Sequence, residues 1–479
     1  MKFRVERDVL GEAVSWVARA LPSRPVVPVL AGLQLAAEDG SLVLSCFDYE
    51  VSARVRVAAE VAEPGTALVP GRLLAEITRS LPPQPAEFTS DADSVSLSCG
   101  GAEFTLVALP AEEFPALPEP PAAAGAADGG VLAAAIAQVV PAASRDDTLP
   151  MLTGVCLDFD GTTLTMAATD RYRLAVRELP WQPASDGLRA AALVPARTLA
   201  EAARTMAAGT PVTVAFDGGE EAPGGGPRPA EGMISFDDGT RRLTVRLIAG
   251  EFIRYQSRFP AGFGCRAEVP AAAFIEAVRR VSLVAERTTP VRLTFGGGAV
   301  IIEAQAEGRA RAIERVRADF DGSEPAIAFN PHYLLDGLTA AAGPVTHARA
   351  GQPAEGEEPA AVAGGLVRIE FTSPAKPALI TWAGPVLAST GLAGTEEGDG
   401  PPAPKKAAGK KAPVKKAAGK GAAVKGAAVP AAGGPAAGLP AAGEPAAEPA
   451  GVGAEPAAAA GPPGSFRYLV VPLRAPARA

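Results

Sequence analysis

The chain has little of what most catalytic and membrane-bound proteins need. Only two of its 479 residues are histidines, so a Ser-His-Asp or Cys-His arrangement has almost no candidates. Four cysteines, Cys46, Cys99, Cys156 and Cys265, lack the spacing of metal ligands or of a disulfide framework, which favours buried thiols in a reducing compartment. No apolar run approaches the roughly 18 residues of a spanning helix, and no signal-peptide pattern opens the sequence. We therefore expect a soluble, cytoplasmic protein.

Motifs for phosphate or metal chemistry are also missing. Gly296-Gly297-Gly298 is not followed by Lys-Ser/Thr or by a helix, so it predicts a turn between strands rather than a phosphate loop. Asp158 and Asp160 flank a hairpin turn, which is more typical of turn chemistry than of a metal pair. We expect no cofactor, no metal and no enzymatic activity. The net charge of -8 argues against a nucleic-acid partner, although it does not show where the charges lie.

What the sequence does contain is a repeat. Residues 150 to 174 alternate apolar and polar side chains across a Gly-Thr-Thr turn, as a half-buried β-hairpin does. The same pattern lies 122 positions earlier, from Pro28, and a weaker copy 136 positions later includes Val291 and Leu293. Three copies predict one module used three times, which agrees with about three domains for a chain of this length.

A second signature follows each hairpin. The helix start Val69-Pro70 returns as Val194-Pro195 and as Asn330-Pro331. A proline in the first turn is compatible with a helix because its missing N–H is not needed there. A further amphipathic helix is predicted from Phe3 to Leu21, and the Pro-, Ala- and Gly-rich residues 116–130 predict a linker. The fold class is therefore α+β, in modules predicted at 1–122, 128–252 and 253–479.

Two low-complexity segments interrupt the third module, at about 342–364 and 384–464. The longer one is mostly Ala, Gly, Pro and Lys, a composition that predicts disorder. Residues 401–430 hold eight lysines and no acidic residue, and without them the rest of the chain would carry -16. This stretch is either a solubilising linker or a weak, salt-sensitive arm for DNA or an acidic partner.

Several short motifs, occurring in a fixed order along the chain, resemble those of a known protein family. They are the opening Met1-Lys2-Phe3, Arg24-Pro25 with Leu30, Thr169-Asp170-Arg171-Tyr172-Arg173-Leu174, and the terminal strand from Tyr468 to Arg474. Together with the three modules they resemble the bacterial DNA sliding clamp, the beta subunit of DNA polymerase III. The resemblance implies a non-catalytic processivity factor. Two copies would join head to tail into a ring of six clamp modules, with helices inside and antiparallel sheets outside.

A ring around duplex DNA needs only a mildly positive inner face, so an acidic chain is compatible with DNA binding. We expect contacts to phosphate without sequence specificity. The resemblance favours Arg24 most, and the arginines expected to face DNA are Arg24, Arg72, Arg79, Arg145, Arg197, Arg204, Arg279 and Arg280.

The resemblance also implies a cleft between modules two and three that receives short peptide motifs of the polymerase III catalytic subunit, the clamp loader and repair factors. An apolar groove with a few polar anchors suits an extended peptide. Its expected wall is Leu152, Thr169, Arg173, Leu174, Asn330, Tyr333, Val470, Val471, Pro472, Leu473 and Arg474.

For the head-to-tail interface of the homodimer, Phe104 and Leu106 on an edge strand are expected to meet Leu283 of the other copy. Several positions near the cleft depart from the family pattern, among them Ile253, Arg258 and Val471. These departures leave two alternatives open. The first is a sliding clamp located at the nucleoid; the second is a clamp-like paralogue that acts as a protein scaffold and binds DNA through its Lys-rich arm.

Overall fold

A computed structural model of the chain describes residues 1–91, 93–217, 228–285, 289–306, 309–323, 326–343, 365–385 and 465–473. These residues form six α-helices and 28 strands. They fall into three repeats with the same order: a strand, a helix, five strands, a second helix and three strands, with one extra two-residue strand, β17, in the second repeat. Both predicted low-complexity segments lie outside the described residues except at their edges.

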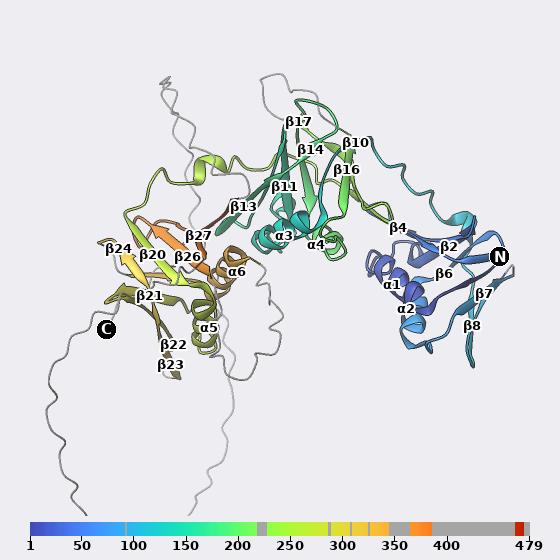
Figure 1. Cartoon of the computed structure of the whole chain (residues 1–479), viewed down its shortest axis with the longest axis horizontal. Coiled ribbons are helices and arrows are strands. Elements are labelled where there is room, and N and C mark those ends of the chain that lie inside the picture. The colour runs from blue at the N-terminus through green and yellow to red at the C-terminus, as the bar shows by residue number, and fades with distance from the viewer. Residues whose placement is uncertain are drawn as a thin grey trace, which may run out of the picture. The chain divides into compact units, whose positions relative to one another are not determined.

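The first repeat runs from β1 to β9. Its helices pack against each other and are labelled together in Figure 1. The elements are β1 (Lys2–Val5), α1 (Arg7–Val17), β2 (Gly32–Glu38), β3 (Ser41–Phe47), β4 (Val51–Ala58), β5 (Glu60–Glu63), β6 (Gly65–Pro70), α2 (Gly71–Ser80), β7 (Ala86–Ser90), β8 (Ser94–Cys99) and β9 (Ala102–Val107).

The second repeat runs from β10 to β19. Asp128 caps α3 by accepting a hydrogen bond from the Val131 N–H at 2.9 Å. The elements are β10 (Ala123–Asp128), α3 (Gly129–Val139), β11 (Gly154–Asp160), β12 (Thr163–Thr169), β13 (Arg173–Pro180), β14 (Gln182–Pro183), β15 (Arg189–Pro195), α4 (Ala196–Ala203), β16 (Pro211–Asp217), β17 (Arg228–Pro229), β18 (Glu231–Asp237) and β19 (Arg241–Arg246).

The third repeat runs from β20 to β28, and its last strand follows β27 only after some 80 residues of chain. The elements are β20 (Cys265–Pro270), α5 (Ala271–Ser282), β21 (Val291–Gly296), β22 (Ala299–Ala306), β23 (Ala310–Arg317), β24 (Asp319–Asp321), β25 (Ala326–Phe329), α6 (Pro331–Ala342), β26 (Gly365–Phe371), β27 (Ala378–Pro385) and β28 (Phe466–Val470).

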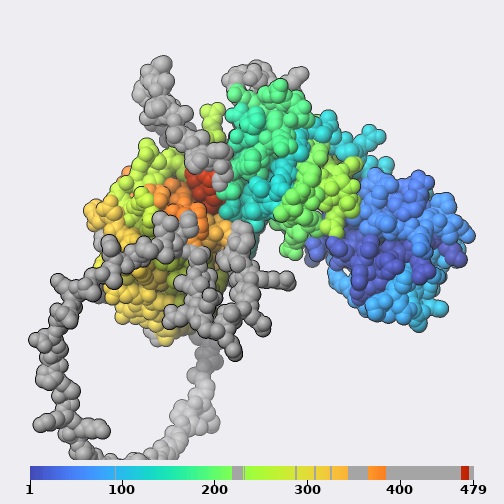
Figure 2. Space-filling model, in the orientation of Figure 1, coloured from blue at the N-terminus to red at the C-terminus, as the bar shows by residue number. Residues whose placement is uncertain are grey.

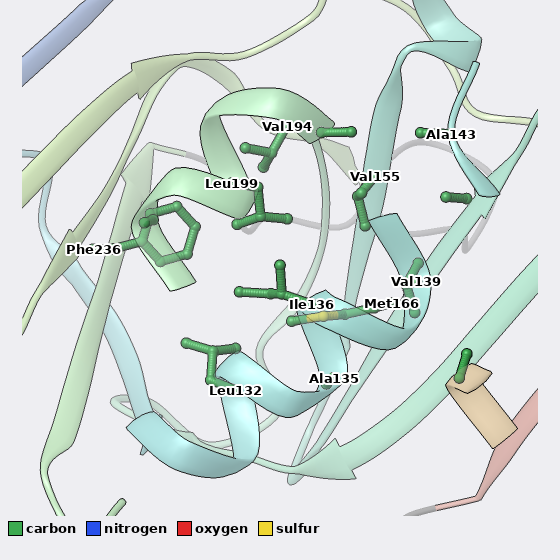
Figure 3. Packing of buried hydrophobic residues seen from close by; sticks show 14 of the residues in the cluster. Leu132, Ala135, Ile136, Val139, Ala143, Val155, Met166, Val194, Leu199 and Phe236 are labelled. Atoms are coloured by element: carbon green, nitrogen blue, oxygen red, sulfur yellow. The ribbon is translucent and has the colours of Figure 1, made fainter. Parts of the chain in front are cut away.

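Each repeat buries one face of its two helices against its strands. In the second repeat, Leu132, Ile136 and Val139 lie on one face of α3 and are all at most 1% exposed. Figure 3 shows them in one cluster with Leu199 of α4 and with strand residues such as Met166. Because each helix turns its apolar face to the strands in this way, its other face is left outside the core.

The sheets cross the borders between repeats. The fourth strand of the first repeat, β4, pairs antiparallel with the ninth strand of the second, β19, in a nine-stranded sheet. The fourth strand of the second repeat, β13, pairs in the same way with the ninth strand of the third, β28, in a ten-stranded sheet. Residues 466–473 accordingly lie in Figure 2 (red) between residues of the second repeat and those of β26 and β27 (orange).

Two expectations about secondary structure are wrong. Phe3 to Val5 belong to a strand rather than to the predicted helix, because β1 pairs with both β5 and β7 and Phe3 stacks on Phe88 at 4.7 Å. Residues 123–128, placed in the predicted linker, form β10 between β14 and β16. Pairing with neighbouring strands outweighs the weak strand propensity of this Ala- and Gly-rich stretch. The domain boundaries themselves stay a prediction.

Candidate functional site

Two of the strands that end sheets, β9 and β23, occupy places in their repeats that are paired at the internal junctions. β9 ends the five-stranded sheet of the first repeat, and β23 ends the four-stranded sheet of the third. Large apolar side chains are exposed beside both edges: Val107 is 72% exposed, Ile313 52% and Leu283 83%. Open strands carrying apolar groups are ready to pair with another chain.

Of the three residues predicted for the dimer interface, Leu283 is the one whose side chain is largely exposed to solvent. Phe104 is half-buried, whereas Leu106 is 2% exposed and belongs to the core of its repeat. The sequence analysis missed Val107 and Ile313, whose alternation with buried neighbours along each strand could have identified them.

All eight arginines predicted to face DNA are exposed, and they lie on helices, at helix ends, or in the loops that join helices to strands of the same repeat. They differ in how far their charge is already engaged. Arg280 forms two hydrogen bonds to Glu314, at 3.1 and 2.5 Å, and Arg279 pairs with Glu276. Arg204 lies 3.4 Å from Glu201.

Within the described residues, Arg24, Arg79, Arg145 and Arg197 form no ion pair. Arg72 donates to the backbone carbonyls of Leu21 and Pro22 at 3.3 and 3.1 Å and keeps its charge uncompensated. These five arginines therefore offer the least compensated positive charge of the predicted set.

The junction of the second and third repeats is built around one buried guanidinium. Arg173, 9% exposed, bonds to Asp170 at 2.9 Å and to Asp336 of α6, and its guanidinium lies 4.5 Å from the centre of the Tyr333 ring. The Tyr468 hydroxyl donates to the Tyr333 carbonyl at 3.0 Å. Burial alone would lower the pKa of Arg173, but Tyr468, Asp336 and Asp170 together raise it above its ordinary value, so the charge is fixed.

The structure brings most of the predicted cleft residues to this junction. Thr169 donates its hydroxyl to the Arg173 carbonyl at 2.6 Å, and Asn330 caps α6 by accepting from the N–H groups of His332 and Tyr333. Leu174 packs with Leu469 in a separate apolar cluster that includes Tyr255 and Val176.

The remaining cleft residues differ in exposure. Val470 is fully buried and Leu152 is 8% exposed, whereas Val471 and Leu473 are each 36% exposed and Pro472 is half-buried. The backbone N–H of Val471 donates to the Tyr172 carbonyl at 2.8 Å, which fixes the end of β28 beside the hairpin of the second repeat. Arg474 lies outside the described residues.

A pocket of about 690 Å³ opens beside this network. Arg173 and Tyr333, predicted for the cleft, line it together with Arg145, predicted for DNA. The sequence analysis missed its other polar groups, because they come from two loops of the second repeat and from α6, some 160 residues further along the chain. They are Ser144, Asp146, Asp170, Arg171, Tyr172, His332 and Asp336.

Neither a metal site nor a membrane span emerges from the part of the chain that the structure describes. It contains no group of three or more His, Cys, Asp or Glu side chains placed to hold an ion. Among these residues no helix combines the length and the apolar character needed to cross a bilayer. All four cysteines are buried and free, and burial raises the pKa of Cys46 and of Cys156 to about 12.

Comparison with known proteins agrees with this architecture. Three family models match in order: the N-terminal domain of the DNA polymerase III beta subunit over residues 1–118, its central domain over 127–253 and its C-terminal domain over 256–348. The chain belongs to the DNA polymerase III beta subunit family. Members of this family are sliding clamps, the processivity factors of DNA polymerase III, and this chain has the same function.

Individual sliding clamps match over most of their length. The beta sliding clamp of Streptomyces coelicolor is 49% identical over 381 residues, which are 80% of this chain and 94% of that protein. The beta sliding clamp homolog GriR of Streptomyces muensis is 44% identical, over 71% of this chain and 88% of its own. A Pseudomonas aeruginosa sliding clamp solved with bound griselimycin superposes with a TM-score of 0.67 at 26% identity, covering 79% of this chain and 95% of that one.

Proposed function

We propose that two copies of this chain close head to tail into a ring that holds duplex DNA. The observation that carries the proposal is the pairing rule inside the chain. Both internal junctions join the fourth strand of one repeat to the ninth strand of the next, as β4 with β19 and as β13 with β28. The two strands left over are the fourth of the third repeat, β23, and the ninth of the first, β9. A second copy satisfies both by the same rule, and two-fold symmetry makes the two head-to-tail contacts equivalent.

The proposed DNA contacts are the predicted arginines, with Arg24, Arg72, Arg79, Arg145 and Arg197 contributing most. In the part of the chain that the structure describes, these five form no ion pair, whereas Arg204, Arg279 and Arg280 pair with glutamates. Contacts of this kind go to phosphate and depend on salt rather than on base sequence.

The proposed partner site is the junction of the second and third repeats, with the predicted cleft residues around Leu174, Tyr333 and Val471. Exposed apolar groups stand there next to a fixed polar network, which suits short peptide motifs of the polymerase, the clamp loader and repair factors. The griselimycin complex of the Pseudomonas clamp supports a ligand site in this fold. We propose no catalytic role for any residue, and we place the protein at the nucleoid.

Retention on DNA tests the proposal. The full chain, loaded on nicked circular DNA, should stay bound through gel filtration in 0.3 M salt and leave when the circle is linearised. A variant in which residues 386–464 are replaced by a short Gly-Ser linker should be retained equally. A variant with four charge reversals, Arg24→Glu, Arg79→Glu, Arg145→Glu and Arg197→Glu, should be retained less than the wild type. Its retention should also fall less steeply as the salt concentration is raised.

The alternative, a scaffold whose DNA affinity comes from the Lys-rich arm, predicts the opposite. Retention would then survive linearisation and disappear with residues 386–464. A chain that stays monomeric at micromolar concentration would also contradict the ring.

A further inference from the structure

One ion pair at the junction of the second and third repeats shows how this type of strand contact is made specific. In the β13–β28 pairing, Arg467 stands opposite Val176. Its guanidinium reaches diagonally along the strand to Glu178, two residues further on, at 2.8 Å. The side chains are 25% and 10% exposed, so the pair is largely shielded from water. Diagonal neighbours at this spacing are within reach of long side chains.

The register of the β13–β28 contact predicts how β23 of one copy would pair with β9 of another, because the repeats have equivalent positions. Ala53, Ala175 and Ala312 are equivalent, because each lies opposite the same core position of the preceding strand: Cys46, Ala168 and Ala304. Leu243, Tyr468 and Phe104 are likewise equivalent, each opposite a core residue of the strand before it: Phe236, Ile380 and Leu97.

Within the chain, Ala53 pairs with Leu243 and Ala175 pairs with Tyr468. The same rule sets Ala312 opposite Phe104 of a second copy. Since the strands run antiparallel, Ile313 then stands opposite Glu103, and Arg315 takes the diagonal place next to Glu103. The apolar Phe104 faces the helix side, where exposed Leu283 is available to cover it.

Glu103 and Arg315 therefore occupy the positions of Arg467 and Glu178 with the two charges exchanged. Both are exposed, and within the described residues neither forms an ion pair. The other diagonal neighbour, Arg311, is already held by Glu303 at 2.6 Å. We infer that Glu103 of one copy pairs with Arg315 of the next across the ring interface, and that this reversed pair selects the correct strand. The inference rests on the proposed ring.

The reversal matters because one chain contains several strands of the same type. If β9 of a second copy competed with β28 for β13, Glu103 would face Glu178. If β28 paired with β23, Arg467 would face Arg315. Like charges disfavour both wrong pairings, β9 with β13 and β28 with β23. The opposite order of the two charges therefore lets β9 and β28 each distinguish β23 from β13. β4 also carries an arginine, Arg56, at the equivalent place, and there β19 covers the strand within the chain.

A charge exchange between two chains tests this inference. Glu103→Arg alone and Arg315→Glu alone each put like charges into both interfaces of a homodimer. We expect each to raise the dimer dissociation constant about 30-fold, since each ring carries the change twice. A one-to-one mixture of the two variants restores opposite charges at both interfaces, one of them in the wild-type sense. We expect its dissociation constant to return to within about threefold of the wild type.

Subunit association would be measured by fluorescence energy transfer between labelled full-length chains at nanomolar concentration. Glu87→Arg is the matched control, because Glu87 lies in the same cross-strand row as Glu103 but two strands inside the edge, and it should change little. Recovery in the mixture also shows that both variants fold.

The inference is overturned if either single variant dimerises as the wild type does, or if the mixture fails to recover. Failure of the ring itself looks different, because the wild-type chain would then not dimerise or would not be retained on circular DNA.

Discussion

The two internal junctions use equivalent strands but differ in how polar groups hold them. At β13–β28, Arg173 is enclosed by two carboxylates and a tyrosine ring, and Arg467 reaches Glu178 across the strands. At β4–β19, Arg54 stands opposite Arg242, which turns back to Asp237 of its own repeat at 2.6 Å. Two ion pairs cross this border, Arg246 with Glu50 at 3.4 Å and Arg241 with Glu12 at 2.5 Å, and both glutamates are largely exposed, at 67% and 71%.

The difference follows from where each ninth strand comes from. β19 is continuous with β18, so backbone connection keeps it near its sheet. β28 is joined to β27 through a long segment, and closing so long a loop costs more conformational entropy. Buried charge pairs can fix the register of two strands, at a cost in desolvation. They are found at β13–β28, the junction at which the chain connection constrains the ninth strand least.

Arg173→Ala is expected to produce the largest difference in stability between the two junctions. This change leaves Asp170, whose side chain is 11% exposed, and Asp336 without their shared cation, and we expect the opening free energy of the β13 and β28 amides to fall by about 3 kcal/mol. Native-state hydrogen exchange measures it strand by strand. Arg246→Ala is the control at the other junction and should lower the β4 and β19 values by less than about 1 kcal/mol. Equal losses at both junctions would contradict the comparison.

Removing the second pair should have a smaller effect. Among the described residues, Glu178→Ala leaves Arg467 with the Phe259 ring, 4.7 Å away, as its remaining partner. We expect a loss of about 2 kcal/mol for the same amides, because the pair is only partly shielded. Glu50→Ala removes an exposed carboxylate that pairs with Arg246 across the β4–β19 border and should cost less than about 0.5 kcal/mol. A larger loss for Glu50→Ala would reverse the ranking of the two junctions.

Alkaline pH should weaken the β13–β28 junction through Tyr255. Burial, the largest cause, raises the pKa of this hydroxyl, so the folded chain keeps it protonated where the unfolded chain ionises near pH 10. Its contribution is present below pH 10 and is lost as the pH rises above that value. Between pH 9 and pH 11 the stability difference between wild type and Tyr255→Phe should shrink by about 1.4 kcal/mol in urea unfolding. A stability difference that stays constant from pH 9 to pH 11 would contradict this expectation.

The smallest expected effect is that of Tyr468→Phe. It removes one hydroxyl, which donates to the Tyr333 carbonyl and lies 3.5 Å from Arg173, while the packing of the ring is retained. We expect a loss of about 1 kcal/mol in the opening of β28 at pH 7. A loss as large as that of Arg173→Ala would mean that the hydroxyl, and not the carboxylates, holds the guanidinium.

The repeat could be predicted from sequence because its signals are local. The hairpin at 150–174 and its copies follow a period of two, and the helix starts carry proline at the same place. What escaped prediction depends on distant partners. Phe3 to Val5 fit a helical pattern until β5 and β7 are known to flank them, and residues 123–128 have almost no strand propensity of their own.

For the candidate sites, the resemblance supplied residues that the structure places at one junction, such as Thr169 and Tyr333. It could not supply Asp336, whose bond to Arg173 spans 163 residues of sequence, nor the pairing of Arg467 with Glu178. Such contacts depend on strand register between repeats, which no local pattern encodes. Glu103 and Arg315 escaped for the same reason, since each looks like an ordinary charge on an edge strand.

The place of β28 in its sheet also has a consequence for biosynthesis. This strand separates β13 from β27, so the ten-stranded sheet cannot become continuous until residues 466–470 leave the ribosome. At ordinary translation speeds the roughly 80 residues after β27 take about 4 to 16 s to synthesise. During that interval β13 and β27 lack the strand that lies between them in the folded chain, and unpaired strand edges of this kind favour aggregation.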